Sequence, residues 1–224
     1  MNIKTVQRIM SGVLFTLAIT VWAEHEIRIE HANKLEEDLT IQAYREVKAY
    51  YKRLGFSMPD DIRPAIIFQD QITINGEVRP DNVGLFDPET TSIRLIHFES
   101  QKFQQLHYLG IEATSDIYYS LIVHELAHCL NAFVSPGLTY AANELIAGNV
   151  QMELMDPETR ERILSIGGEI MLSSYRDVSL SAYHNYGPQN YILASYGYCK
   201  EHPKMLLRFL NQKVPEIKDP FLLH

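Results

Sequence analysis

Two histidines and a glutamate lie within about one helical turn of each other in the stretch "SLIVHELAHCLNAF" at residues 120–133. His124 and His128 are four residues apart, so on a helix their imidazoles project from the same face. At that spacing both rings can bind one zinc ion at about 2.0–2.1 Å. Glu125 leans over the same face, where it can accept a proton from a water that the metal activates. The stretch therefore predicts a zinc-dependent hydrolytic site.

The same residues also fit a different interpretation, a core helix whose two histidines only hydrogen-bond to neighbours while Glu125 is solvated. Apolar residues do flank the histidine face on both sides, with Ile122, Leu126 and Leu130 in one row and Val123 and Ala127 in the next. A third metal ligand separates the two interpretations.

Glu144 is the candidate for that third ligand. The turn "SPGLT" at 135–139 is followed by a predicted helix over 140–155 that carries Glu144 near its start. His128 lies about one turn before the first helix ends, and a short connection makes neighbouring helices antiparallel, so the two side chains can meet at one height. Gly148, on the face of Glu144, is expected to let this helix approach the first one closely. The alternative is a surface glutamate.

With this third residue the sequence resembles the gluzincin clan of zinc metallopeptidases, in which HExxH is followed by a helix that supplies a glutamate ligand. The resemblance covers about residues 83 to 200 and depends on HELAH and the downstream NELIA. It implies that His124, His128 and Glu144 bind Zn²⁺ and that Glu125 is the general base. It also implies that "VGLFDPETTSIRLIHF" forms a strand–turn–strand unit at a substrate cleft. The function implied is that of a peptidase acting on peptide or protein.

The sequence departs from the family at Gly148, where many relatives carry an aspartate that orients the first histidine. Support for His124 is then expected from Asn149, Gln151 or a backbone carbonyl. The departure leaves room for a noncatalytic gluzincin-like domain that uses zinc structurally or binds a partner protein. Glu125 favours the enzyme, because a structural site has no need of a general base.

Peptide hydrolysis builds negative charge on the carbonyl oxygen, which a tyrosine or histidine can stabilise. The stretch "SAYHNYGPQNYILASYGYC" offers Tyr183, His184 and Tyr186. It resembles the tyrosine-bearing segment that follows the ligand helix in the family, and we predict that Tyr186 supplies the donor. The alternative for each tyrosine is that its ring packs under the HELAH helix.

The remaining pattern predicts the elements that position these residues. An amphipathic helix is expected at 38–54, strands are expected in "RPAIIFQD" and "SIRLIHFE", and a turn at 82–91. Further helices are expected at 115–133, 140–155, 157–173, 188–200 and 203–212. Strands followed by helices indicate an α+β fold, a small N-terminal antiparallel sheet packed on a mostly helical, zincin-like C-terminal part. His97, His107 and His202 have no partner at metal spacing and are expected to be surface or core residues.

The N-terminus has the pattern of an export signal. Lys4 and Arg8 precede the apolar run "VLFTLAITVWA" at 13–23, which ends in small residues. We therefore expect a signal peptide at 1–23 and one domain at 24–224 that is secreted or periplasmic and leaves the membrane after cleavage. An uncleaved anchor is the alternative, although the run is short for a bilayer.

Length and charge limit the remaining possibilities. The chain has 224 residues, 46% of them hydrophobic, which suits one domain with a sizeable core. Removing residues 1–23 changes the net charge from −8 to −10, so nucleic acid is not an expected partner. The oligomeric state stays open. Cys129 and Cys199 are the only cysteines, and we predict that they are joined in an oxidising compartment, with two buried free thiols as the alternative.

Overall fold

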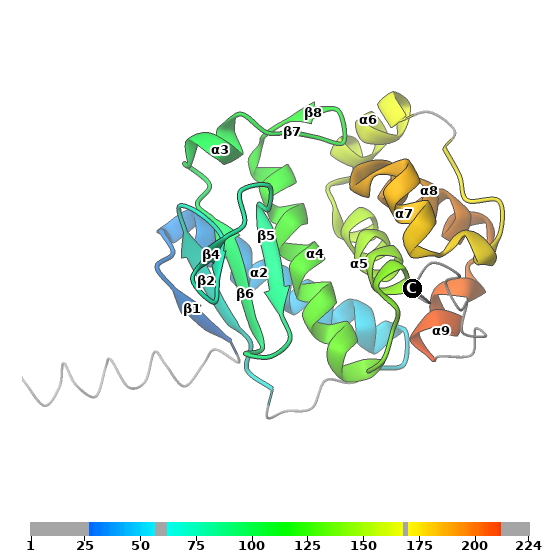
Figure 1. Ribbon diagram of the computed structural model, residues 1–224, viewed down its shortest axis with the longest axis horizontal. Coiled ribbons are helices and arrows are strands. Elements are labelled where there is room, and N and C mark those ends of the chain that lie inside the picture. Colours follow the sequence, from blue (N-terminus) through cyan, green and yellow to red (C-terminus); the bar gives the residue numbers. More distant parts are fainter. Residues whose placement is uncertain (1–26, 57–61, 168–169, 212–224) are drawn as a thin grey trace, which may run out of the picture.

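The structure, a computed structural model, describes residues 27–56, 62–167 and 170–211. A small sheet lies on one side of a central helix, and the helices that follow this helix in the chain gather on the opposite side (Figure 1). The expected α+β class is thus confirmed. The expected signal peptide at 1–23 lies outside the described residues. Among the helices described, none has the length and apolarity needed to cross a membrane.

The main sheet has four strands in the order β1-β2-β6-β5. Their bounds are β1 (Arg28–Glu30), β2 (Ala65–Gln69), β5 (Gly84–Asp87) and β6 (Ser92–Ile96). β1 is parallel to β2, β2 is parallel to β6, and β5 alone runs antiparallel, paired with β6. The expectation of an antiparallel sheet is therefore wrong. The connection from β1 to β2 contains a long helix, and such a crossover brings the chain back parallel, whereas the tight turn after β5 reverses it.

β5 falls inside the segment 82–91 that was expected to be a turn. Only the part of this segment that follows Asp87 is a turn, and it leads the chain back into β6. Glycine and the Asp-Pro pair are strong turn signals, and they outweigh the short apolar pair Leu85–Phe86 in a reading of the sequence alone.

The crossover helix α2 (Lys34–Arg53) begins four residues earlier than expected. Asn33 caps it in a capping box with Glu36, each side chain bonding the other residue's backbone N–H. Its buried face packs against the central helix α4. Five short elements complete the part of the chain before α4. They are the hairpin of β3 (Thr73–Ile74) and β4 (Glu77–Val78), the hairpin of β7 (His107–Tyr108) and β8 (Ile111–Glu112), and α3 (Gln101–Gln104) between the two hairpins.

The second half is helical. It comprises α4 (Ser115–Val134), α5 (Tyr140–Leu154), α6 (Pro157–Gly167), the short 3₁₀ helix η1 (Tyr175–Asp177), α7 (Leu180–Tyr186), α8 (Pro188–Glu201) and α9 (Lys204–Leu210). The expected helices 115–133, 140–155 and 188–200 are confirmed to within one residue at each end. The expected helix 157–173 is too long, because α6 ends at Gly167 and residues 170–173 are not helical. The helix α7 was not expected.

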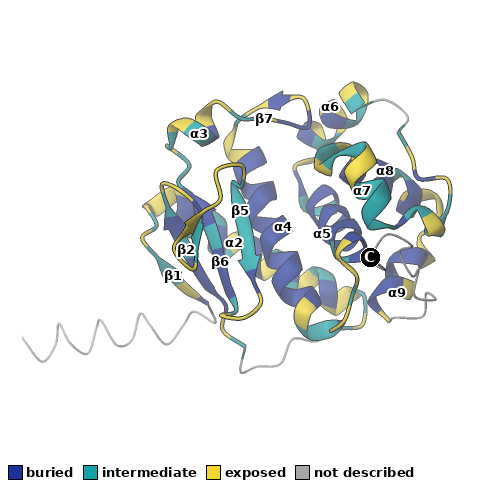
Figure 2. Cartoon of the chain, in the orientation of Figure 1, coloured by how far each residue is buried: buried dark blue, intermediate teal, exposed yellow. Residues whose placement is uncertain are grey.

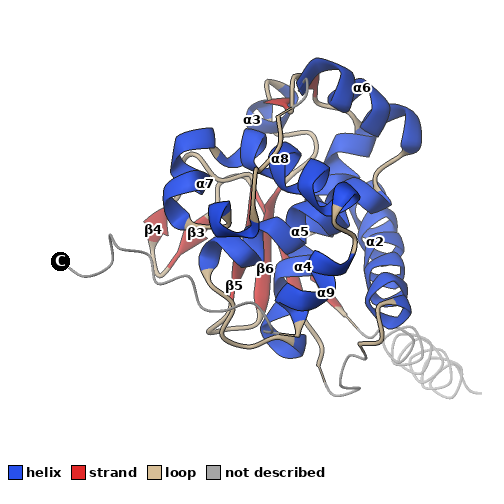
Figure 3. Cartoon of the chain, turned by 90° about the vertical axis from the view of Figure 1, so that its right-hand side faces the viewer, coloured by secondary structure: helices blue, strands red, loops and turns tan. Residues whose placement is uncertain are grey.

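α4 is the centre of the molecule. Fifteen successive residues, from Ile117 to Asn131, are buried in it, and Figure 2 shows it dark along nearly its whole length. The sheet and α2 pack on one side of α4 and α5 packs on the other, while α5 also packs against α8. The view in Figure 3 shows the same layers, with the strands β5 and β6 behind the helices. This arrangement holds the HELAH motif between the sheet and the helical half.

Two finer expectations are wrong. Cys129 on α4 and Cys199 on α8 are both buried and free, so they do not form a disulfide. α5 packs between their two helices, and burial raises the pKa of each thiol to about 12. Gly148 does not serve the approach of α5 to α4, because a Cβ there would meet the side chain of Ile192 on α8 at 2.9 Å. The missing side chain makes room for α8 instead.

Candidate metal centre

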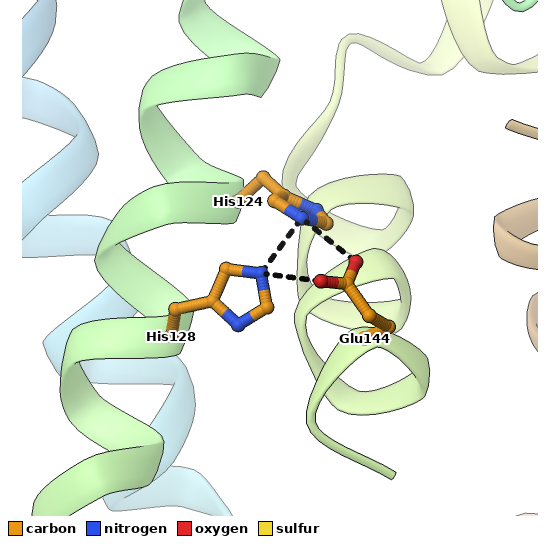
Figure 4. A group of neighbouring side chains, drawn as sticks. All are labelled: His124, His128 and Glu144. Atoms are coloured by element: carbon orange, nitrogen blue, oxygen red, sulfur yellow. Dashed lines mark hydrogen bonds and ion pairs between the residues drawn. The ribbon is translucent and has the colours of Figure 1, made fainter. Parts of the chain in front are cut away.

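Three of the expected site residues converge between α4 and α5 (Figure 4). The Nε2 atoms of His124 and His128 lie 2.9 Å apart. Glu144 on α5 reaches both rings, with Oε2 at 3.5 Å from His124 Nε2 and Oε1 at 3.5 Å from His128 Nε2. All three side chains are buried, and their ligand atoms lie within 4.8 Å of one another. The helix caps explain the alignment, since Thr114 and Thr139 fix where α4 and α5 begin.

The donor atoms of this cluster fit a tetrahedral metal. Zinc bonds of about 2.0–2.1 Å place tetrahedral ligand atoms roughly 3.3–3.4 Å apart. The two imidazole nitrogens lie 2.9 Å apart, and each lies 3.5 Å from a different oxygen of Glu144. One shared proton can join the two imidazole nitrogens, but it cannot also serve the two carboxylate oxygens that face them. A cation placed between the three groups can serve all of them.

Hydrogen bonds behind His124 fix its tautomer. Ser120 Oγ donates to the carbonyl of Ile117 at 2.8 Å, so it accepts from Gln151 Nε2 at 3.1 Å. The amide oxygen of Gln151 therefore faces His124 Nδ1, at 3.0 Å, and also accepts from Tyr108 at 3.2 Å. His124 must carry its proton on Nδ1, which leaves the Nε2 lone pair directed at the cluster. Gln151 is therefore the one of the expected residues that supports the His124 ring.

Asn149, another expected support, faces elsewhere. Its Nδ2 donates to the carbonyl of Leu145 at 2.9 Å, within α5. Its side chain also hydrogen-bonds with Cys199 on α8. Asn149 is therefore part of the packing between α5 and α8 rather than of the cluster.

His128 is supported less completely. Its Nδ1 is buried without a hydrogen-bond partner among the described residues. Burial and then the neighbouring His124 lower the pKa of His128, and the nearby Asn143 side chain acts in the opposite direction. Asn143 Oδ1 is itself held by Asn131 Nδ2 at 2.7 Å, and Asn131 accepts from Tyr51 at 2.6 Å. A chain of amides thus connects α2 to the second histidine.

Glu125 lies beside the cluster, and only 8% of its surface is exposed. Burial raises the pKa of its carboxyl to about 7; the charge of His128 and a hydrogen bond with the backbone of Phe86 oppose this rise, and Glu144 adds to it. A carboxyl with a pKa near neutrality can both accept and release a proton. The side chain contacts β5, so the edge of the sheet forms its outer support.

Glu144 is held as a carboxylate. Burial alone would raise its pKa, but the contact with His124 and the charges that His128 and His124 carry when protonated outweigh that effect and lower the pKa to about 2. Tyr140, in the first turn of α5, lies close enough to favour the charged form as well, although its hydroxyl donates to Tyr183. Sequence reasoning missed Tyr140, although its position four residues before Glu144 places both on one helical face.

The cluster lies in a cavity of about 1110 Å³. One wall is the stretch from Val83 to Phe86 at and before β5, and the other includes Tyr140, Tyr183 and Ile192. Apart from the histidines, the described lining residues include no cationic side chain, whereas Asp81 lies at the margin. A cavity of this size and lining can take a short peptide segment.

The expected oxyanion donor, Tyr186, lines this cavity, but no interaction with the cluster is found for it. Tyr183, one turn earlier on α7, is closer to the chemistry. Its hydroxyl accepts from Tyr140 at 3.3 Å, and the negative charges of Glu144 and Glu125 contribute to raising its pKa, after burial. His184 is exposed and does not line the cavity.

Taken together, the fold and the site define an α+β protein with a buried cluster of two histidines and a glutamate on a pair of antiparallel helices. The chain belongs to the family of unknown function DUF6639, whose profile matches residues 27–212. Comparisons with curated proteins and with solved structures give no match. The matched range includes the whole cluster and all of the elements that position it.

Proposed function

We propose that this protein is an exported, zinc-dependent metallohydrolase of the gluzincin type, a peptidase that hydrolyses peptide bonds. The observation that carries the proposal is the convergence of His124, His128 and Glu144 on one point, with the buried carboxyl of Glu125 beside them and a peptide-sized cavity in front. A structural metal site has no use for such a base or for an open cavity.

His124 and His128 would hold the metal through Nε2 and Glu144 would hold it through its carboxylate. Zinc bound there supplies a Lewis acid that can lower the pKa of water toward about 7. Glu125 takes the proton from the attacking water on its carboxylate and then passes it to the leaving amine. Gln151 keeps the proton of His124 on Nδ1, so that the ring cannot turn its N–H toward the metal.

The substrate class follows from the cavity walls. β5 is an edge strand that pairs only with β6 among the described residues. Ile96 N–H donates to the carbonyl of Val83, so the alternation of an antiparallel ladder turns the backbone groups of Gly84 and Phe86 toward the open edge. The N–H of Phe86 meets Glu125 there, while among the described residues the N–H and C=O of Gly84 and the C=O of Phe86 stay open. An extended peptide can pair with that edge. Because the described lining has no lysine or arginine for a terminal carboxylate, internal, uncharged segments fit best.

The oxyanion donor in this proposal is a tyrosine of α7. Tyr140 donates its proton to the hydroxyl of Tyr183, which leaves the proton of Tyr183 free for a substrate oxygen. This arrangement favours Tyr183 over Tyr186, the residue favoured by the sequence pattern.

The noncatalytic alternative, zinc held for structure or for binding a partner protein, was suggested by the absence of an aspartate at position 148. The missing aspartate no longer favours this alternative, since Gln151 accepts from His124 Nδ1–H, which is the role that the aspartate would have. Glu125, buried and close to the cluster, also has no part in the alternative.

The experiment compares the zinc content and hydrolytic activity of wild type, Glu125→Gln and Glu144→Ala. Glu125→Gln should keep zinc but lose about 10²–10⁴-fold in kcat, because only the base is removed. Glu144→Ala should be poor in metal and melt lower, because metal binding is coupled to folding. If Glu144→Ala held zinc as tightly as wild type, the ligand set would be wrong. Wild-type rates for Glu125→Gln on a confirmed substrate would rule out the base.

A further inference from the structure

Gly84, the first residue of β5, lies directly against the side chain of Glu125. A Cβ built on Gly84 would lie 2.8 Å from Cγ and 2.8 Å from Oε1 of Glu125, and 3.1 Å from Cδ. Real Cβ atoms almost never approach other atoms so closely, so one of the two groups would have to move. The carboxyl of Glu125 therefore rests on the one position of β5 that lacks a side chain.

The backbone gives no reason for glycine at this position. Gly84 does not have the positive φ of Gly76, Gly110 or Gly187, and it pairs regularly with Leu95 on β6. A glycine in a strand lowers stability because it has no side chain to pack and loses more chain entropy on folding. The lack of a side chain at Gly84 is thus explained by the space it leaves.

Glu125 cannot easily yield that space. It is buried, and its carboxylate hydrogen-bonds with the backbone of Phe86, two residues further along β5. Other close glycines differ in this respect, because Gly148 and Gly167 face the branched apolar side chains of Ile192 and Leu193. Such side chains have no directed bond to lose, whereas a shift of Glu125 changes where its oxygens point.

We propose that Gly84 is a positioning residue, and that β5 forms a seat for the Glu125 carboxylate with the bare Cα of Gly84 as its base and the backbone of Phe86 as its anchor. The catalytic part of this inference depends on the proposed function, but the seat itself does not. A methyl group at position 84 would push the carboxylate away from the point where it meets the attacking water. Displacements of about 1 Å can cost on the order of 10²-fold in rate.

The test uses Gly84→Ala, with Gly197→Ala as the matched control. A Cβ at Gly197 on α8 would make only ordinary contacts, the nearest at 3.6 Å. Gly84→Ala should keep one zinc per chain and an unchanged KM, with kcat about 10–100-fold lower. Gly197→Ala should match wild type. A higher KM with unchanged kcat would mean that the methyl group blocks the substrate instead, and would overturn the proposal.

A second measurement does not need activity. Melting temperatures of metal-free wild type, Gly84→Ala, Glu125→Ala and the double variant form a cycle. Gly84→Ala alone should melt roughly 2–10 °C lower, as overpacking does in a domain of this size. In the Glu125→Ala background the same change should cost nothing, because the obstructing side chain is absent. If Gly84→Ala does not fold by itself, recovery of folding in the double variant gives the same support.

The outcomes separate the two proposals. An equal loss of melting temperature in both backgrounds would overturn the seat, whatever the activity. Strong coupling in the cycle together with no hydrolysis by zinc-loaded wild type would support the seat and remove the proposed function. Hydrolysis by wild type with an unchanged kcat in Gly84→Ala would retain the peptidase and overturn the positioning role.

Discussion

Two histidine–glutamate clusters, one at the start of α2 and one between α4 and α5, differ in how their carboxylates are satisfied. At the first, between α2 and β6, Glu36 is fully buried. It accepts from the backbone N–H of Asn33 and of Phe98, both at 2.8 Å, and lies 3.2 Å from His97 Nδ1. Every one of these contacts ties one part of the chain to another, so the carboxylate has an internal donor on each side.

At the second cluster the same residue types face one another with few donors. Glu144 has two imidazole nitrogens at 3.5 Å, and the hydroxyl of the nearby Tyr140 donates to Tyr183. His128 Nδ1 has no hydrogen-bond partner among the described residues. The cluster also opens on a cavity, which Glu36 does not line.

The difference separates a structural carboxylate from one prepared for a ligand. Buried polar groups are normally paired, so a cluster whose acceptors outnumber its donors indicates that something else completes it. Glu36 is complete within the fold and should serve stability. The cluster of His124, His128 and Glu144 is incomplete within the described fold, and in the proposed function a cation completes it.

The largest expected effect is a loss of stability when Glu36, the structural carboxylate, is removed. Glu36→Ala removes a fully buried carboxylate and leaves two backbone N–H groups and His97 without their acceptor, and losing one partner of such a network typically costs about 3–5 kcal/mol. Glu37→Ala is the matched control, because Glu37 occupies the same first turn of α2 but is partly exposed. Urea unfolding of both variants measures the loss. Zinc stoichiometry of the folded fraction should not change, and a metal-poor Glu36→Ala would contradict the separation of the two clusters.

A smaller effect of opposite sign is expected at Glu125. Its folded pKa of about 7 lies above the unfolded value, so the folded state favours the protonated form. Stability is unaffected below about pH 4, where both states are protonated, and is lost as the pH rises to about 7. Glu125→Gln removes this loss, and the metal-free variant should be more stable than metal-free wild type by up to about 3 kcal/mol at pH 7–8.

Chemical unfolding of both metal-free proteins at pH 5, 6, 7 and 8 measures this difference. The advantage of Glu125→Gln should shrink toward pH 5. A constant difference across the series, or a variant less stable than wild type at pH 8, would show that Glu125 is satisfied in the way that Glu36 is.

The sequence predicted the ligand cluster because its geometry is local. Positions 124 and 128 share a helical face wherever the helix lies, and the short turn at 135–139 forces Glu144 back beside them. The contacts with β5 and Gln151 depend on distant packing instead. Nothing in the sequence places Gly84 against Glu125, and the parallel pairing of β1 with β2 depends on a crossover that the strand patterns do not encode.

Gly148, which stands where many gluzincins have an aspartate, also shows that contacts between distant elements cannot be predicted from the sequence. From the sequence, Gly148 reads as a lost aspartate and a closer approach of α5 to α4. In the structure Ile192 fills the space beside it, and Gln151 supports His124 from one turn further along α5. The sequence offered Asn149 and Gln151 as equal candidates, and only the hydroxyl of Ser120, which orients the Gln151 amide, separates them.

The smallest expected effect concerns this support and extends the comparison to the histidines. Gln151→Met keeps an unbranched side chain of similar length but removes the acceptor for His124 Nδ1–H, so the ring is free to turn its proton toward the metal. Loss of such a support typically weakens metal binding by about 10–100-fold.

Gln151→Glu retains an acceptor and should bind zinc at least as well as Gln151→Met does. Asn149→Ala, on the same helix but directed at Leu145 and α8, should bind zinc as wild type does. Competition with a chromogenic chelator measures the dissociation constant of each folded variant. If Gln151→Met and wild type bound zinc equally, His124 would not depend on the amide, and the second cluster would need no internal support of the kind that completes Glu36.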